Sequence, residues 1–170
     1  MTLKKNLVFL GMMGSGKSSI GYLVSKKLHF VFIDIDNLIE EESGLSISEI
    51  FKIKGEGYFR NLEEKITLKN LKGVNKVISL GGGGFINDKI RKKILIDHFS
   101  FWLDWDESVL LERIKDSKKR PLAFQATNHD IKKLIKERTR IYSKAQFKIN
   151  CNKHSKTEIV KKIIKIYELN

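Results

Sequence analysis

Short apolar runs alternate with amphipathic stretches along this chain of 170 residues. Short apolar runs bounded by turn residues are typical of buried strands, and apolar residues recurring every three or four positions are typical of helices. The predicted strands are Asn6–Leu10, Val31–Asp34, Val77–Leu80, Ser100–Leu103 and Phe147–Asn150. The predicted helices are Lys17–Leu28, Ser48–Lys52, Tyr58–Leu71, Asp88–Ile96, Glu107–Lys115, Ile131–Lys144 and a closing segment with Ile159, Val160, Ile163, Ile164 and Tyr167. This alternation predicts an α/β fold, a five-stranded parallel sheet flanked by helices.

Length and composition limit the domain organisation. A chain of this size is expected to form one domain, residues 1–170, with a substantial core. No segment approaches the roughly eighteen apolar residues of a membrane span, and the first predicted strand leaves no room for a leader peptide. Cys151 is the only cysteine, which excludes a disulfide framework and a zinc cluster. We therefore expect a cytoplasmic protein without a membrane partner.

The chain is strongly basic, with a formal net charge of +13. Its lysines are spread along helical segments among isoleucines, without an aromatic and basic stripe, so we interpret them as a solvated surface and expect no nucleic-acid partner. An RNA-binding protein is an alternative, and its mark would be steeply salt-dependent binding to random oligonucleotides. The positive field also favours the approach of anionic nucleotides and substrates.

The strongest chemical signal is the segment Gly11–Ser19, which satisfies G-x-x-x-x-G-K-[ST] between a predicted strand and a predicted helix. In that context the loop glycines let backbone N–H groups face a phosphate, and the helix adds the positive end of its dipole. Lys17 is expected to reach the outer phosphates and the Ser18 hydroxyl to ligate Mg²⁺. The sequence therefore predicts a site for a nucleoside triphosphate.

Two aspartates, Asp34 and Asp36, follow the second predicted strand. In strand-end geometry their carboxylates would point the same way, toward the phosphate loop. One would hold Mg²⁺ through water while the other accepts a hydroxyl proton, as phosphoryl transfer to an alcohol requires. Alternatively, Asp36 is simply the N-cap of a helix over Asn37–Glu42.

Arginines and glycines elsewhere are further candidates. Arg60 is predicted in the first turn of a helix, where a cation opposes the dipole; this suggests capture of a carboxylate or phosphate, although Glu63 or Glu64 could simply pair with it. Four glycines, Gly81–Gly84, follow a buried strand and place bare backbone against a ligand or the phosphate loop.

The polar interval Asp116–Asn128 reads as a mobile loop beside the site. A lid cation from the basic residues flanking it could neutralise a transferring phosphoryl group, and the candidates are Arg113, Lys118, Lys119 and Arg120. Arg138 and Arg140 lie in a later predicted helix, and spacing alone does not choose between them.

Together these motifs resemble the shikimate kinase family. The matching segments span Gly11 to about Lys153 and are, in order, Gly11–Ser19, Asp34-x-Asp36, Phe59-Arg60-x-x-Glu63, Ser79-Leu80-Gly81-Gly82-Gly83, Arg113 through Arg120-Pro121-Leu122, and Arg138-x-x-x-Tyr142. The phosphate loop is shared by many kinases, whereas the other segments together are specific. The resemblance implies a fold like the nucleoside monophosphate kinases, with a substrate-binding segment at about 35–63 and a lid at about 116–128. It also implies that ATP phosphorylates the 3-hydroxyl of shikimate, a step toward chorismate and the aromatic amino acids.

The resemblance implies roles residue by residue. The ATP-binding set is Gly14, Ser15, Gly16, Lys17, Ser18, Ser19, Arg113 against the adenine, and Arg120 as the lid cation. Mg²⁺ would be held by Ser18, with Asp34 in its outer shell. The shikimate-binding set is Asp36, Arg60, Gly81, Gly82, Gly83 and Arg138, and the catalytic set is Asp36 as the base with Lys17 and Arg120. We expect a monomer whose partners are ATP and shikimate.

The chain departs from the family pattern at several positions: Ile35 between the aspartates, Gly84 after the glycine triplet, Ala123 after Arg120-Pro121-Leu122, and Lys153 and His154 in the adenine-side loop. None of them carries a group assigned to chemistry, so they bear on affinity and lid behaviour. A gluconate kinase would share the fold and loop without needing Arg60 and Arg138. A GTPase-type module would need N-K-x-D, and the nearest segment, Asn152–Ser155, ends in serine.

Overall fold

The computed structural model describes residues 5–115 and 126–170. Its sheet contains five parallel strands in the order β2-β3-β1-β4-β5. The strands are β1 (Leu7–Leu10), β2 (Val31–Asp34), β3 (Lys76–Ser79), β4 (Phe99–Asp104) and β5 (Phe147–Asn150). Val8 of β1 is in register with Ile78 of β3 and with Ser100 of β4. The predicted five-stranded parallel sheet is therefore confirmed.

Helices connect successive strands and close the chain. They are α1 (Lys17–Leu28), α2 (Ile35–Ser43), α3 (Ile47–Ile53), α4 (Gly55–Asn70), the 3₁₀ turn η1 (Gly84–Ile86), α5 (Asp88–Asp97), α6 (Glu107–Lys115), α8 (Asn128–Tyr142) and α9 (Lys156–Glu168). Within the described residues, no helix is long and apolar enough to cross a membrane.

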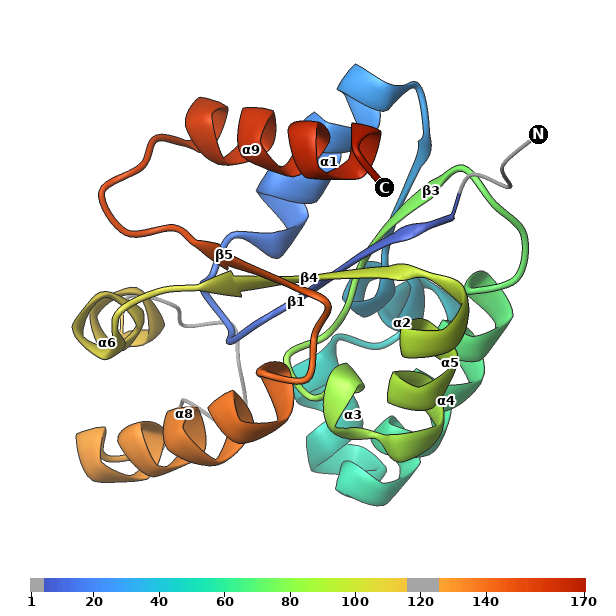
Figure 1. Cartoon of the computed structure of the whole chain (residues 1–170). Helices are drawn as coiled ribbons and strands as arrows, with labels where there is room; N and C mark the ends of the chain where they lie inside the picture. The colour runs from blue at the N-terminus through green and yellow to red at the C-terminus, as the bar shows by residue number, and fades with distance from the viewer. Residues whose placement is uncertain (1–4, 116–125) are drawn as a thin grey trace.

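Both faces of the sheet are covered by helices (Figure 1). In β1, Leu7 and Phe9 join a cluster that includes residues of α1 and α9, while Val8 and Leu10 join a cluster on the opposite face that includes residues of α2–α6 and α8. Side chains of a strand alternate between faces, so a strand buried on both sides carries apolar residues at every position. This explains why β1 appears in the sequence as a continuous apolar run.

Helix starts differ from the apolar pattern where capping or packing decides them. Helix α8 begins at Asn128 rather than Ile131, because Thr127 and Asp130 form a capping box before the first apolar residue. Helix α4 begins at Gly55 rather than Tyr58, although glycine is a poor helix former. The prediction that Arg60 lies in the first turn is therefore wrong, since an additional turn precedes it.

The connection after β2 also differs from the prediction. Helix α2 starts directly at Ile35, and Asp34 is its N-cap, accepting a hydrogen bond from the Asn37 backbone at 3.3 Å. Asp36 lies inside the first turn. The alternative in which Asp36 caps the helix is therefore wrong, and a helix start rather than a strand end sets the directions of the two carboxylates.

The carboxyl ends of all five strands meet at one edge of the sheet because the strands are parallel. Strand β1 lies between β3 and β4, so chain connections diverge to either side of it. Ligands of open α/β sheets bind outside the carboxyl ends at such a point. The loops after β1, β3 and β4, with the start of α2, are therefore the place to look for a site.

Candidate active site

The loop between β1 and α1 has the conformation of a phosphate cradle. Gly16 is the N-cap of α1 with φ of 86°, a left-handed conformation that L side chains rarely adopt. Lys17 is buried, and its ammonium donates to the carbonyls of Gly11 at 2.9 Å and Met12 at 2.8 Å. The backbone N–H of Ser15 also donates to Met12 O, at 3.2 Å. The loop is therefore closed around its own lysine.

Ser18, at the start of α1, connects the loop to β2 and β3. Its hydroxyl donates to the Asp34 carboxylate and lies 3.4 Å from the Ser79 hydroxyl. Among the described residues no group of three or more His, Cys, Asp and Glu side chains forms a metal cluster. One hydroxyl and one carboxylate nevertheless suit Mg²⁺, which keeps several waters and binds substrate phosphates together with one or two protein oxygens. Ser18 and Asp34 therefore fit the predicted metal site.

The glycine run after β3 is packed against charged side chains. A Cβ on Gly81 would lie 2.7 Å from Asp36 Oδ1 and 2.7 Å from Glu63 Oε1, and one on Gly82 would lie 3.0 Å from Arg138 NH1 and 3.6 Å from Met13 N. One on Gly83 would overlap the Arg60 guanidinium. Bare backbone is thus needed here because the charged side chains of Asp36, Glu63, Arg60 and Arg138 lie close to it, while the phosphate loop is at ordinary contact distance.

Arg60 and Glu63 form an ion pair on α4 in which Glu63 is buried and the Arg60 side chain is 31% exposed. Arg60 NH1 donates to Glu63 Oε2 at 2.8 Å, and Arg60 also reaches Glu56 at 3.3 Å. Burial raises the pKa of the Glu63 carboxyl, against the lowering influence of Arg60, and the Asp36 charge adds to the rise. Burial lowers the pKa of Arg60, but the charges and hydrogen bonds of Glu63 and Glu56 raise it by more. The pKa of Arg60 is therefore raised overall. Of the two predicted partners, Glu63 holds Arg60, whereas Glu64 pairs with Lys89.

Arg138 on α8 is the second arginine brought to this region. It is 7% exposed, whereas Arg140 on the same helix is exposed, so the structure resolves the choice that spacing left open. Arg138 NH1 is buried without a hydrogen-bond partner among the described residues. A buried guanidinium nitrogen without an acceptor is costly. An anionic group in the adjoining space would supply that acceptor.

That space is a cavity of about 490 Å³ between α4, η1 and α8. Its charged lining is Glu56, Arg60, Glu63, Glu137 and Arg138, and its apolar lining includes Ile86, Leu134 and Ile141. The carboxylates outnumber the arginines, but Glu56 and Glu63 are engaged by Arg60. Arg138 is therefore the cation best placed to meet an incoming carboxylate.

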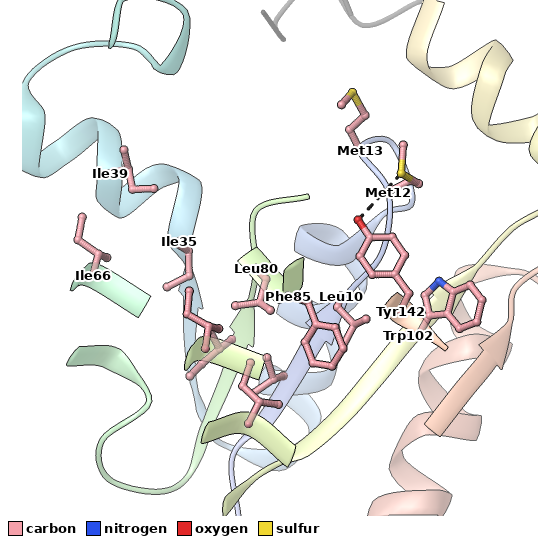
Figure 2. Packing of buried hydrophobic residues seen from close by; sticks show 14 of the residues in the cluster. Leu10, Met12, Met13, Ile35, Ile39, Ile66, Leu80, Phe85, Trp102 and Tyr142 are labelled. Atoms are coloured by element: carbon pink, nitrogen blue, oxygen red, sulfur yellow. Dashed lines mark hydrogen bonds between the residues drawn. The ribbon is translucent and has the colours of Figure 1, made fainter. Parts of the chain in front are cut away.

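Tyr142, one turn after Arg138, joins the glycine run to the phosphate loop. Its hydroxyl donates to Gly82 O and lies 4.0 Å from Met12 Sδ, a contact drawn in Figure 2. Burial raises the pKa of Tyr142 to about 12, so the hydroxyl stays protonated and can donate throughout the neutral range. The two halves of the site thus touch at a buried tyrosine.

On the other side of the loop, Arg113 of α6 stacks on Trp105, with its Cζ 3.9 Å from the ring centre, and donates to Gly14 O at 3.2 Å. Arg113 is therefore at the phosphate loop, while Lys118, Lys119 and Arg120 lie outside the described residues. Sequence reasoning missed Trp105 altogether. An aromatic residue directly after β4, at the carboxyl edge, was the signal that could have found it.

A phosphate loop close to a cavity with two arginines in its lining, Arg60 and Arg138, is the arrangement of a kinase that acts on a small anionic molecule. Residues 13–168 match the model of the shikimate kinase family. The chain is 42% identical over 166 residues to a shikimate kinase of Thermodesulfovibrio yellowstonii, covering 96% of this chain and 95% of that protein. The chain belongs to the shikimate kinase family.

Solved structures agree with this assignment. The chain resembles a shikimate kinase from Acinetobacter baumannii in complex with shikimate, with a TM-score of 0.92 at 26% identity, covering 98% of this chain and 94% of that chain. It also resembles the shikimate kinase from Aquifex aeolicus, with a TM-score of 0.85 at 39% identity, covering 96% of each chain. The predicted family and the kinase fold are confirmed.

Proposed function

We propose that this kinase transfers the γ-phosphoryl group of ATP to the 3-hydroxyl of shikimate, giving ADP and 3-phosphoshikimate. The observation that carries the proposal is the position of Arg138. Its buried NH1 has no acceptor among the described residues and lies at the edge of a cavity next to the phosphate loop. Shikimate is a small polyol with one carboxylate, so it offers both the missing acceptor and a hydroxyl to phosphorylate.

On the donor side, the β- and γ-phosphates of ATP would rest on the backbone N–H groups of Gly14–Ser19. The Lys17 ammonium, now held by the Gly11 and Met12 carbonyls, would turn toward the phosphate oxygens. Ser18 and Asp34 would hold Mg²⁺, which, when bound, offsets the negative charge of the phosphates. The base of the nucleotide would lie on Arg113, and Arg120 is proposed as the lid cation.

On the acceptor side, Arg138 and Arg60 would bind the shikimate carboxylate through charge-assisted hydrogen bonds. The backbone of Gly81–Gly83 would lie against the ring, since any side chain there would collide with the charged groups. Asp36 would accept a hydrogen bond from the 3-hydroxyl. These contacts hold the hydroxyl oxygen at one end of the line along which the γ-phosphoryl group moves.

In the transfer itself, the shikimate oxygen forms a bond to the γ-phosphorus while the bond from that phosphorus to the β–γ bridging oxygen breaks. Asp36 takes the hydroxyl proton, and ADP leaves with the electron pair of the broken bond. A carboxylate suffices as the base because phosphoryl transfer depends on positioning and charge stabilisation more than on basicity. Glu63, close to the same glycine as Asp36, would hold Arg60 in place.

The remaining parts of the proposal are Mg²⁺ as the companion of ATP, a monomeric chain and a cytoplasmic location. The donor pair Ser18 and Asp34 supports Mg²⁺, and the single thiol, Cys151, which is buried, supports the cytoplasmic location.

A coupled assay of ADP release tests the acceptor. Shikimate, gluconate, nucleoside monophosphates and no acceptor are compared at equal ATP and Mg²⁺ concentrations. The expected result is that, of the acceptors compared, only shikimate causes ADP release, with an equal amount of 3-phosphoshikimate formed. A faster rate with gluconate would assign the cavity to a different hydroxy acid, and ADP release without any acceptor would make the protein an ATPase.

A further inference from the structure

Trp105 occupies a position that the kinase reaction described above does not use. It follows β4 directly, at the carboxyl edge of the sheet, and its partly buried ring packs against both hydrophobic clusters. Its indole Nε1 donates to the carbonyl of Ser15 at 2.9 Å. The residue directly after β4 is therefore bonded to the centre of the phosphate loop, some ninety positions earlier in the chain.

The face of the indole supports a second contact to the loop. The Arg113 guanidinium lies over the ring at 3.9 Å, and Arg113 NH1 donates to Gly14 O at 3.2 Å. Stacking of a planar guanidinium on tryptophan is attractive and leaves the donors at its rim free to bond. Trp105 and Arg113 thus hold two consecutive carbonyls of the loop, those of Gly14 and Ser15.

These two bonds fix the directions of the loop peptides. In a planar trans peptide the C=O and the following N–H point to opposite sides. With the Ser15 carbonyl turned to the indole, the Gly16 N–H faces away from Trp105, and this N–H is among those expected to face a phosphate. The Trp105 hydrogen bond therefore orients one of the donors on which nucleotide binding depends.

The segment carrying Trp105 is itself anchored. The Asp106 backbone N–H donates to Asn152 Oδ1 at 2.9 Å, and Asn152 Nδ2 donates to Asp106 Oδ1 at 3.0 Å. This pair joins the loop after β4 to the loop after β5. The indole consequently has a defined position before any nucleotide arrives.

We propose that Trp105 is a positioning residue for the nucleotide, acting through Arg113 and through the Ser15–Gly16 peptide. One face of the Arg113 guanidinium is covered by the indole, and Arg113 is otherwise exposed, which leaves the opposite face to a nucleotide base. The base would then complete a stack of indole, guanidinium and purine. This inference rests on the proposed function only in that ATP is the phosphoryl donor.

Two substitutions distinguish the hydrogen bond of Trp105 to Ser15 from its stacking with Arg113. Trp105→Phe keeps a ring for Arg113 but removes the N–H to Ser15, whereas Trp105→Leu removes both. We expect the KM for ATP to rise about 3- to 10-fold in Trp105→Phe, the range of one lost neutral hydrogen bond, and further in Trp105→Leu. The KM for shikimate should stay within about twofold, and kcat should change less than the ATP KM.

Trp102→Phe is the matched control, because it alters the other tryptophan of the chain, which lies in β4 just before Trp105, and leaves Trp105 and Arg113 unchanged. Its KM for ATP should equal that of the unchanged protein. The same variant retains Trp105 as the only tryptophan, so its fluorescence should change on titration with ATP or ADP. In Trp105→Phe, which retains Trp102, that change should be much smaller.

The outcomes separate the inference from the function on which it rests. If the unchanged protein neither turns over nor binds ATP, the proposed function fails. If it turns over normally but Trp105→Phe and Trp105→Leu keep the normal ATP KM, Trp105 does not position the nucleotide. Equal losses in both KM values and kcat, with a lowered melting temperature, would make the role of Trp105 structural and overturn the proposal.

Discussion

The donor and acceptor halves of the site are built in opposite ways. The phosphate loop is one contiguous segment whose lysine is bonded to carbonyls five and six positions away. The acceptor half draws on separate elements: Arg60 of α4, Gly83 of the loop after β3 and Arg138 of α8 line the cavity, while Asp36 of α2 lies beside Gly81 of the same loop. Local bonds therefore close the phosphate loop around Lys17, with two supporting bonds from Trp105 and Arg113, whereas only the completed tertiary structure forms the acceptor half.

The two halves also differ in the groups that compensate their charged side chains. Lys17 is compensated within the loop by backbone carbonyls, which an incoming phosphate can replace. In the acceptor half, Arg60 is compensated by Glu56 and Glu63, but Arg138 NH1 lacks an acceptor among the described residues. An unmet buried donor is a cost that the fold carries without ligand. Binding of a carboxylate would remove that cost. Arg138 would therefore favour ligands that carry a carboxylate over ligands that do not.

Asp36→Asn should have the largest effect, because Asp36 is the residue that we propose as the base of the transfer. We expect turnover to fall about 10²- to 10⁴-fold, the range for a positioned base, while nucleotide affinity stays nearly unchanged. ADP release measures the first and equilibrium titration with ADP the second. Asp97→Asn removes the same charge from the opposite edge of the sheet and should leave both unchanged. Near-normal turnover of Asp36→Asn would exclude Asp36 as the base.

Arg138→Ala and Arg60→Ala should each raise the KM for shikimate, by roughly 10- to 100-fold for a lost charge-assisted hydrogen bond. Their effects on stability should differ. Arg60→Ala leaves the buried Glu63 carboxylate without its main cation and should lower the melting temperature, whereas Arg138→Ala removes an unsatisfied donor and should not. Steady-state kinetics and thermal melting without ligand measure the two effects.

Arg140→Ala is the control for this pair, since Arg140 is exposed on the same helix as Arg138. It should change neither the KM nor the melting temperature. An unchanged shikimate KM in both Arg60→Ala and Arg138→Ala would place the carboxylate site elsewhere. Equal destabilisation by both substitutions would contradict the view that Arg138 is held at a cost.

The contrast between the halves also explains how far the sequence could be interpreted. The ranges of α1, α6, β2 and β5 were predicted to the residue because apolar spacing and local turn residues determine them. The start of α8 was missed although its capping box, Thr127 and Asp130, is visible in the sequence. The start of α4 at Gly55 was not predictable, since two glycines in its first turn argue against a helix.

The same limit applies to the site. The phosphate loop was predictable because its chemistry is contained in nine consecutive residues. Arg138 could not be separated from Arg140 by spacing, because only the packing of α8 decides which of them is buried. Likewise, Asp34 and Asp36 were expected to face the same way, but the start of α2 directs Asp34 to Ser18 and Asp36 toward Gly81. The directions of these two side chains depend on where α2 starts, and the apolar pattern did not predict a start at Ile35.

Tyr142→Phe should have the smallest effect and is the sharpest test of whether the halves act separately. The substitution removes the hydrogen bond from the Tyr142 hydroxyl to Gly82 O and the side-chain contact with Arg138, so the KM for shikimate should rise about 2- to 10-fold. The 4.0 Å contact to Met12 Sδ is weak, because a thioether is a poor acceptor, and the KM for ATP should stay within about twofold.

Because the pKa of Tyr142 is raised by burial to about 12, its hydroxyl is protonated at every pH used for the assay. The ratio of the two shikimate KM values, variant to unchanged protein, should therefore be constant between about pH 6 and pH 9. A ratio that falls toward one with rising pH would mean that the hydroxyl ionises in this range. An equal rise in the KM for ATP would mean that the glycine run and the phosphate loop are coupled through Met12. The two halves would then be separate in how the fold builds them but not in how they bind their substrates.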